Sequence, residues 1–305
     1  MQVQLGINTC FALKRWPEPA DWASLVRNDL GLDCVELSLD LLDGFESPKE
    51  RPRVVERTRT ALAEYRLRAP STFTGLQAYV LNLLMHPDPE RRTAALRWYH
   101  AVVDLTAELG ARATGGHVGS MSTPEWSDPA TRAERWAGLK RDLAEIAAHA
   151  REAGLEYLMV ENLVAVREPS NMADVAGLLT QGDDRRVPVR LSLDVGHQCG
   201  PGMSGDDLDP YAWLRRFGPA AAEIQLQQSD AAGDHHWPFT LERNAQGRID
   251  AGRVLDTLSG VGATSVLLML EIIPGFEDAD DQVRRDLQAS VQYWRTALSE
   301  RGLGA

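Results

Sequence analysis

Short apolar runs alternate along the chain with longer stretches in which apolar residues recur every three or four positions. Eight runs have the length of a strand: Val3 to Cys10, Cys34 to Leu39, Arg68 to Thr74, Arg112 to Gly116, Glu156 to Glu161, Val189 to Asp194, Ala222 to Gln227 and Ser265 to Ile272. Helical spacing is clearest in four intervening stretches: Asp21 to Leu30, Pro89 to Leu109, Ala130 to Ala153 and Asp278 to Leu298. Strands that alternate with amphipathic helices are typical of βα units and a parallel sheet.

Glycines mark the ends of several predicted helices. Gly31, Gly110 and Gly154 each stand just before an apolar run, where a left-handed residue can end a helix and turn the chain back. No linker or low-complexity tract divides the chain, and the stretch from Cys199 to Pro210, rich in Pro, Gly and Asp, is expected to be a long loop beside an active site. The pattern therefore predicts one α/β domain over residues 1–305, a single (β/α)8 TIM barrel.

Charge and apolar content narrow the class of partner. A formal net charge of -12 opposes the phosphate backbone, so we expect no nucleic-acid partner. No apolar run approaches the ~20 residues that cross a bilayer, so we expect no membrane partner and a cytoplasmic protein. Cys10, Cys34 and Cys199 form no CxxC pair, which favours a reducing compartment and cysteines that serve in packing.

Acidic residues close three of the predicted strands. Glu161 and Glu271 each follow a run of apolar residues, and Asp194 ends another run three positions before His197. Active sites of such barrels lie at the C-terminal ends of the strands, where these carboxylates would crowd together and repel one another. Any one of them alone could equally form a salt bridge that closes the barrel. Together they indicate a divalent cation with oxygen ligands.

Other polar residues are expected on the loops of the same face. Those that we expect to bind substrate are His86, His117, Asp234, His236 and Trp237. Gly115 and Gly116, with Lys14 and Arg15, could also hold an anion, but glycines are equally needed for a tight βα turn. The segment Asp234 to His236 could likewise be a solvated turn rather than part of the site. Aromatic residues that could wall a sugar, or serve only in packing, are Phe11, Trp16, Trp126 and Trp237.

These strand ends and loops resemble the xylose-isomerase-like sugar-phosphate isomerases and epimerases, a superfamily that includes D-tagatose and D-psicose epimerases and apurinic-site endonucleases. The similarity covers nearly the whole chain. The opening Ile7 to Ala12, the segment His86 to Glu90 and the segment His236 to Thr240 look closer to the erythrulose-phosphate, or tetrulose-phosphate, epimerase branch.

The resemblance implies a metal bound by Glu161, Asp194, Gln225 and Glu271. Gln225 stands where the family carries a histidine, so either an amide oxygen binds the ion, or His236 or another group replaces it, or the ion is bound weakly. Such a mostly oxygen shell favours Mn or Mg, with Zn or Co as alternatives. By the same resemblance, Glu161 and Glu271 exchange protons with opposite faces of the substrate, and His197 orients a substrate oxygen or shuttles a proton.

The resulting hypothesis is a metal-dependent epimerase or isomerase of a short ketose or ketose phosphate. A tetrulose phosphate is favoured, and the reaction would abstract the proton alpha to the carbonyl through an enediolate. Two alternatives stay open: a lyase, decarboxylase or hydrolase on the same barrel, and a metal-poor sugar-binding protein. The expected partner is a small sugar or sugar phosphate, and a homodimer is left open beside a monomer.

Overall fold

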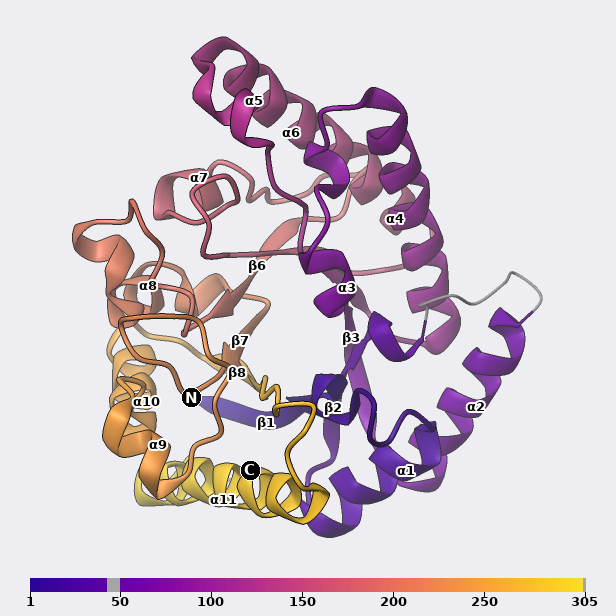
Figure 1. The fold of residues 1–305 in the computed structure, drawn as a ribbon. Coiled ribbons are helices and arrows are strands. Elements are labelled where there is room, and N and C mark those ends of the chain that lie inside the picture. The colour runs from indigo at the N-terminus through magenta and orange to yellow at the C-terminus, as the bar shows by residue number, and fades with distance from the viewer. Residues whose placement is uncertain (43–49, 304–305) are drawn as a thin grey trace.

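The computed structural model describes residues 1–42 and 50–303, and its centre is a closed barrel of parallel strands. Each strand pairs with the next, and β8 closes the barrel by pairing with β1 (Figure 1). The strands are β1 Gln2–Asn8, β2 Cys34–Ser38, β3 Arg68–Phe73, β4 Ala113–Gly116, β5 Tyr157–Glu161, β6 Val189–Asp194, β7 Glu223–Leu226 and β8 Ser265–Leu270. Every one overlaps the run predicted for it, which confirms the single (β/α)8 TIM barrel.

Helices surround the strands in Figure 1. They are α1 Pro19–Ser24, α2 Arg51–Glu64, α3 Gly75–Tyr79, α4 Pro89–Leu109, α5 Thr123–Ser127, α6 Pro129–Glu152, α7 Met172–Ala176, α8 Pro210–Phe217, α9 Leu241–Gln246, α10 Ala251–Gly260 and α11 Asp280–Glu300. The N-caps explain where α4 and α6 begin. The Asp88 and Asp128 carboxylates each accept a backbone N–H from the first turn of their helix, and a proline directly follows each aspartate. The predicted helix Asp21 to Leu30 is divided, since a π-helical turn, Leu25–Asp29, follows α1.

Left-handed glycines end helices where the sequence predicts them. Gly31, Gly110 and Gly154 have φ angles of 65°, 79° and 87°. The backbone N–H of Gly110 donates to carbonyl oxygens of the last turn of α4, so the chain turns there toward β4.

The two faces of the strands carry different chemistry. Outward residues such as Ile7, Leu37, Val160, Leu193 and Leu268 pack with helix residues in the apolar core between barrel and helices. Because side chains alternate along a strand, their neighbours point into the barrel. Many of these neighbours are polar and buried, among them Asn8, Glu36, Ser71, Ser192, Glu223 and Gln225. The interior of the barrel therefore contains a layer of buried polar side chains, the polar layer.

Hydrogen bonds satisfy most of this layer. The Ser71 hydroxyl lies 3.2 Å from Glu36 Oε1 and 3.1 Å from Glu223 Oε2, so it bridges two buried carboxyl groups. Asn8 Nδ2 donates to Glu36 Oε2 at 2.8 Å, and Ser192 Oγ donates to Glu223 Oε1 at 2.9 Å. Burial raises the pKa of Glu36 and of Glu223, and their proximity adds to the increase for Glu36.

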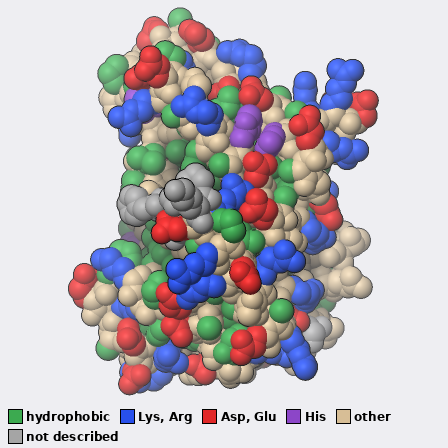
Figure 2. Space-filling model, turned by 90° about the vertical axis from the view of Figure 1, so that its right-hand side faces the viewer, with side chains coloured by type: hydrophobic (Ala, Val, Ile, Leu, Met, Phe, Trp, Pro, Cys, Tyr) green, Lys and Arg blue, Asp and Glu red, His purple; other side chains and the backbone are tan. Residues whose placement is uncertain are grey.

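The outer surface mixes charges of both signs. Basic and acidic side chains are interspersed over the face shown in Figure 2. Some pair between helices, as Arg51 of α2 does with Glu108 of α4 at 3.2 Å. Within residues 1–42 and 50–303, no helix combines the length and hydropathy needed to cross a membrane.

Two glycines of β4 allow its neighbours to approach closely. A Cβ on Gly115, whose φ is 148°, would lie 2.0 Å from the Met159 carbonyl oxygen, and one on Gly116 would lie 2.5 Å from the Phe73 ring. Steric contact with β5 and with Phe73 therefore explains these glycines without an anion.

We expect Gly115→Ala to destabilise the protein by about 2 kcal/mol or more, because the new methyl group collides with backbone that cannot move freely. The matched control is Gly110→Ala, which also has a positive φ but no atom within 4 Å of the added Cβ, and it should cost about 1 kcal/mol. Urea unfolding of both variants measures the difference. Equal losses would contradict the steric explanation.

Candidate functional site

Most of the predicted site residues meet in one small cavity at the C-terminal end of the barrel. The cavity has a volume of about 110 Å³. Its lining residues are Cys10, Phe73, Gly75, Leu76, Tyr79, His117, Glu161, His197, Asp234, His236, Glu271 and Ile273. The structure thus joins residues that are up to 263 positions apart in the sequence, from Cys10 to Ile273.

Three carboxylates form the centre of the site. Glu161 ends β5, Asp194 ends β6, and Glu271 directly follows β8. One oxygen of each lies within 4.8 Å of the others, although the three residues are only 1%, 0% and 4% exposed. Burial raises the pKa of Asp194 and of Glu271, and the neighbouring Glu161 adds to both increases, while nearby imidazolium groups oppose them. A divalent cation would relieve the repulsion between these crowded carboxylates.

Several buried acceptor oxygens of the predicted ligand residues have no hydrogen-bond partner among the described residues. They are Glu161 Oε1, Glu161 Oε2, Gln225 Oε1 and Glu271 Oε2. Buried acceptors are normally satisfied, so unpaired ones need an explanation such as an ion. All four belong to residues of the predicted ligand set, and the donors are hard oxygens. The residues present therefore fit a divalent metal.

Gln225 lies within β7, where it pairs in register with Asp194 of β6. Its Nε2 donates to Glu36 Oε2 in the polar layer at 3.4 Å, and its Oε1 is free of hydrogen bonds. The side chain is completely buried. Gln225 thus pairs with Asp194 through the backbone, while its side chain contacts Glu36 and is not among the residues that line the cavity.

Two histidines flank Glu161. His117 Nε2 lies 3.1 Å from Glu161 Oε2, and His197 Nδ1 lies 3.4 Å from Glu161 Oε1. The His117 ring also contacts Thr74 Oγ1, and His197 Nδ1 lies 2.7 Å from the Asn162 carbonyl oxygen, which favours a proton on that nitrogen. Burial alone would lower the pKa of His197, but the charges of Asp194, Asp234 and Glu161 raise it well above its usual value.

The loop after β7 brings a third imidazole to the site. Asp234 joins two histidines, with Oδ2 3.3 Å from His197 Nε2 and Oδ1 3.3 Å from His236 Nε2. His236 Nδ1 lies 3.2 Å from the Glu271 carbonyl oxygen. Nitrogens of His197 and His236 also lie within 4.8 Å of an Asp194 oxygen, which makes a second group able to hold a metal. Asp234 and His236 therefore line the cavity, while His235 contacts Asp230 and Trp237 instead.

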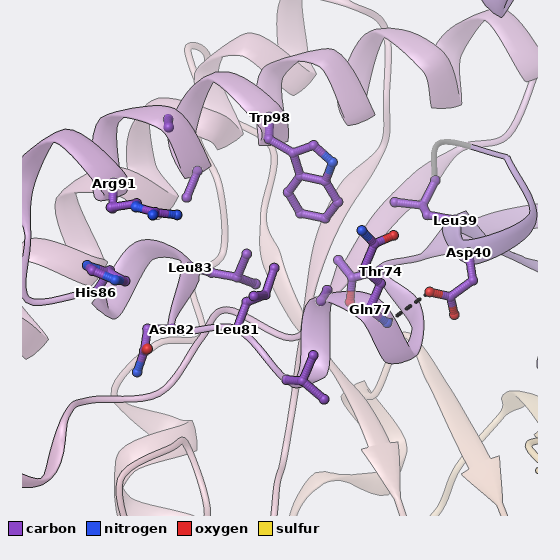
Figure 3. A pocket seen from close by; sticks show the side chains of 14 residues that line it. Leu39, Asp40, Thr74, Gln77, Leu81, Asn82, Leu83, His86, Arg91 and Trp98 are labelled. Atoms are coloured by element: carbon purple, nitrogen blue, oxygen red, sulfur yellow. Dashed lines mark hydrogen bonds between the residues drawn. The ribbon is translucent and has the colours of Figure 1, made fainter. Parts of the chain in front are cut away.

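Other predicted residues lie away from this cavity. His86 lines a separate pocket with Asn82, Leu83 and Arg91, where α3 and α4 meet (Figure 3). Trp237 stacks on His235 at 3.9 Å instead of lining the cavity. The structure therefore does not place these two side chains with the other predicted substrate-binding residues.

The residues predicted to bind an anion, and the aromatic residues predicted to wall a sugar, do not line the cavity either. The Arg15 guanidinium donates to the carbonyl oxygens of Gly275 and Asp278, at 2.8 and 2.6 Å. Lys14 lies over the Phe276 ring. The cavity lining includes no Lys, Arg or Trp from the described part of the chain, and none of its residues comes from the loop Cys199 to Pro210.

Gln227, Tyr79 and Cys10 are among the site residues that were not predicted from the sequence. Gln227 Nε2 lies 3.2 Å from both Asp194 oxygens and 2.8 Å from Asp234 Oδ1, and its Oε1 accepts the His236 N–H. The period of two in β7 was a signal for it, because Gln227 shares the inward face of Gln225. Tyr79 and Cys10 also line the cavity, but nothing in their sequence neighbourhood marks them.

The chain matches the family model described as "Xylose isomerase-like TIM barrel" over residues 26–295. It belongs to this family. The family match therefore agrees with the class of protein that the closed barrel and the carboxylates at its mouth indicate.

Particular relatives add detail. The chain is 28% identical to D-erythrulose 1-phosphate 3-epimerase of Brucella abortus (strain 2308), and the match covers 96% of each chain. A crystal structure from Rhodospirillum rubrum ATCC 11170, provisionally named a xylose isomerase, shares 35% identity and a TM-score of 0.89, covering 96% of this chain and 99% of that one. D-Psicose 3-epimerase from Clostridium cellulolyticum H10 shares the fold, with a TM-score of 0.68 and 15% identity over 99% of this chain and 100% of that one.

The charge of Asp234 should control the protonation of His236. Burial opposes the charged imidazole, but Asp234, with Glu271 and Asp194, raises the pKa of His236 to about 10. We expect Asp234→Asn to lower that pKa by about 1 to 3 pH units, because the nearest negative charge is removed. NMR titration of the imidazole in metal-stripped protein measures it. Asp230→Asn, which alters the partner of His235 instead, is the control, and an unchanged His236 in Asp234→Asn would refute the assignment.

Proposed function

We propose that the protein is a divalent-metal-dependent epimerase of a short ketose or ketose phosphate, with a tetrulose phosphate as the favoured substrate. The observation that carries the proposal is the group of three buried carboxylates at the barrel mouth, two of which, Glu161 and Glu271, have oxygens without a hydrogen-bond partner. The match to D-erythrulose 1-phosphate 3-epimerase over 96% of both chains supports the substrate class.

The proposed ligands are Glu161, Asp194, Gln225 and Glu271. His236 is the alternative to Gln225, but both of its ring nitrogens already lie near partners, the Glu271 carbonyl oxygen and Asp234. Gln225 Oε1 has no such partner, which favours the amide as the fourth ligand. A mostly oxygen shell suits Mn or Mg better than Zn. A cation held there supplies positive charge for the substrate oxygen on which negative charge develops.

Glu161 and Glu271 are the proposed acid and base. Glu161 ends β5 and Glu271 follows β8, three strands further round the barrel, and both line the cavity. In this proposal a substrate binds between them, with one carboxyl group on each face. One group, as the carboxylate, removes the proton alpha to the carbonyl, and the other, as the protonated carboxylic acid, donates its proton to the opposite side, which inverts that carbon. His117 Nε2 and His197 Nδ1 lie 3.1 and 3.4 Å from the two Glu161 oxygens and flank the carboxyl group, although neither contact has hydrogen-bond geometry. For His197 or His236 to donate to a substrate oxygen, its Nε2 would exchange Asp234 for the substrate.

One observation favours a second candidate, an epimerase of unphosphorylated ketoses. A phosphate group is usually bound by Arg, Lys or free backbone N–H groups, and the described cavity lining contains neither Arg nor Lys. The cationic groups beside it are the imidazoles of His197 and His236. The phosphate is therefore the part of the proposal that most needs a direct test.

We expect Glu161→Gln and Glu271→Gln each to reduce kcat by at least about 100-fold, because each change removes a ligand charge and a proton carrier. Glu223→Gln is a matched control, since Glu223 is also buried inside the barrel but does not line the cavity. Steady-state kinetics with circular dichroism as a folding check measures the effect. Substantial activity in either variant would mean that the acid and base are misassigned.

Metal binding should stabilise the protein. We expect about one Mn per chain by elemental analysis, and a rise in Tm on adding Mn to stripped protein, because an ion that binds only the folded state stabilises it by mass action. Glu161→Gln should show a smaller rise, since it loses a charged ligand. A stripped protein whose Tm is indifferent to Mn and Mg would remove the metal site.

The experiment that tests the function is incubation with Mn in D2O, with NMR detection of deuterium at the carbon next to the carbonyl. The panel should pair four-carbon ketose phosphates with the same ketoses lacking phosphate, and should include free ketohexoses. Exchange restricted to the tetrulose phosphates supports the favoured substrate. Exchange only in unphosphorylated ketoses supports the second candidate. Loss of CO2 or bond cleavage in place of exchange would refute epimerisation.

A further inference from the structure

A second group of side chains able to hold a cation lies beside the three central carboxylates. One ligand atom each of Asp194, His197 and His236 lies within 4.8 Å of the others, and Asp194 belongs to both groups. Asp234 extends the second group, because its carboxylate oxygens lie 3.3 Å from His197 Nε2 and 3.3 Å from His236 Nε2. A carboxylate shared in this way could bridge two divalent ions, since each of its oxygens has lone pairs for a different ion.

The NH2 group of Gln227 faces the ligand atoms of this second group. Gln227 Nε2 lies 3.2 Å from both Asp194 oxygens and 2.8 Å from Asp234 Oδ1. It also lies 3.3 Å from His236 Nε2. The carboxylate lone pairs that would bind an ion are therefore directed at an NH2 group, which carries partial positive charge on its hydrogens.

The other end of the Gln227 amide fixes its direction. The backbone N–H of His236 donates to Gln227 Oε1 at 2.6 Å, and a backbone N–H can only donate. The NH2 group must therefore face the carboxylates. Gln227 is completely buried, and Gly196 leaves room for it, because a Cβ at Gly196 would collide with the Gln227 side chain.

The two groups differ in their unpaired atoms. Glu161 and Glu271 of the first group have buried oxygens without a hydrogen-bond partner, whereas none of the unpaired buried atoms found in the described part of the chain belongs to the second group beyond that. The hydrogen bonds of Gln227 contribute to this difference. Buried acceptors that already have partners do not need an ion to satisfy them.

We propose that Gln227 takes the place of a second cation and limits this site to one divalent ion. Its NH2 group satisfies carboxylate oxygens that could otherwise bind a second ion beside the first. The inference rests on the proposed function, because it takes Asp194 as a ligand of the first ion. Pairs of ions about 3.5–4 Å apart are typical of phosphatases, nucleases and aminopeptidases. The amide therefore separates the proposed epimerase from a hydrolase on the same barrel.

The neighbouring Gln228 provides a matched control. It is also a buried amide, but its Nε2 donates to Asn244 Oδ1 and to the Ile249 carbonyl oxygen, at 2.9 Å each. A Cβ at Gly247 would collide with Gln228, so this amide too fills space that a glycine leaves. Removing either amide should disturb the packing to a similar extent. Only the loss of Gln227 should open a cation site.

The test is the number of Mn(II) ions bound per chain, measured on metal-stripped protein from the electron paramagnetic resonance signal of the free ion. Wild-type protein and Gln228→Ala should each bind about one ion, and Gln227→Ala about two. The two ions in Gln227→Ala should give an exchange-coupled signal, because both would use Asp194. Adding Asp234→Asn to Gln227→Ala should return the number to about one, since the second ion loses a charged ligand.

The outcomes separate the inference from the proposed function. Wild-type protein and Gln227→Ala that bind the same number of ions would overturn the inference alone, and so would a second ion that persists after Asp234→Asn is added. Wild-type protein that binds no Mn(II) would remove the metal site and the inference with it. If circular dichroism shows that Gln227→Ala is unfolded, Gln227→Ser replaces it, with Gln228→Ser as its control.

Discussion

The crowding of carboxylates at one end of the barrel is the constraint on which the site depends. Glu161, Asp194 and Glu271 are almost completely buried and lie within 4.8 Å of one another through single oxygens. Three negative charges so placed would destabilise the fold unless protons, imidazolium groups or a cation balanced them. The raised pKa values of Asp194, Glu271, His197 and His236 all express this one electrostatic requirement.

Two layers of residues surround these carboxylates. Around the mouth, His117, His197 and His236 bring imidazoles to the carboxylates, and Asp234 links two of them. Below the mouth, Glu36 and Glu223 are held by hydroxyl and amide donors in a network with few unpaired atoms. Oxygens of Glu161 and Glu271 are left without a hydrogen-bond partner among the described residues, and a cation bound by them would satisfy both.

The fold and the chemistry rest on different grounds. Closed βα barrels host many reactions, so membership of the xylose isomerase-like family establishes the architecture, while the reaction must be argued from the residues at the mouth. Two carboxyl groups beside a cation site suit proton transfer next to a carbonyl group. The absence of Arg and Lys from the described cavity lining leaves the phosphate of the substrate to be decided by experiment.

The sequence by itself determined the barrel and its central carboxylates. Alternation of apolar runs and amphipathic stretches is a local signal, and it located every strand, because burial on the helix-facing side imposes the pattern on each strand separately. Glu161, Asp194 and Glu271 could be assigned to one site because the C-terminal ends of parallel strands must meet at one end of a barrel.

Loop residues could not be placed in this way. His86 and Trp237 follow strands as His117 and His236 do, yet only the latter pair lines the cavity. Gln227, which contacts Asp194, and Tyr79, which lines the cavity, were not predicted from the sequence. The direction of a loop side chain depends on packing against elements distant in the sequence, as when Trp237 stacks on His235 and Arg15 binds the loop before α11. Those contacts, and the hydrogen bonds from Gln227 to Asp194 and Asp234, exist only after the barrel has closed, so only the tertiary structure decided them.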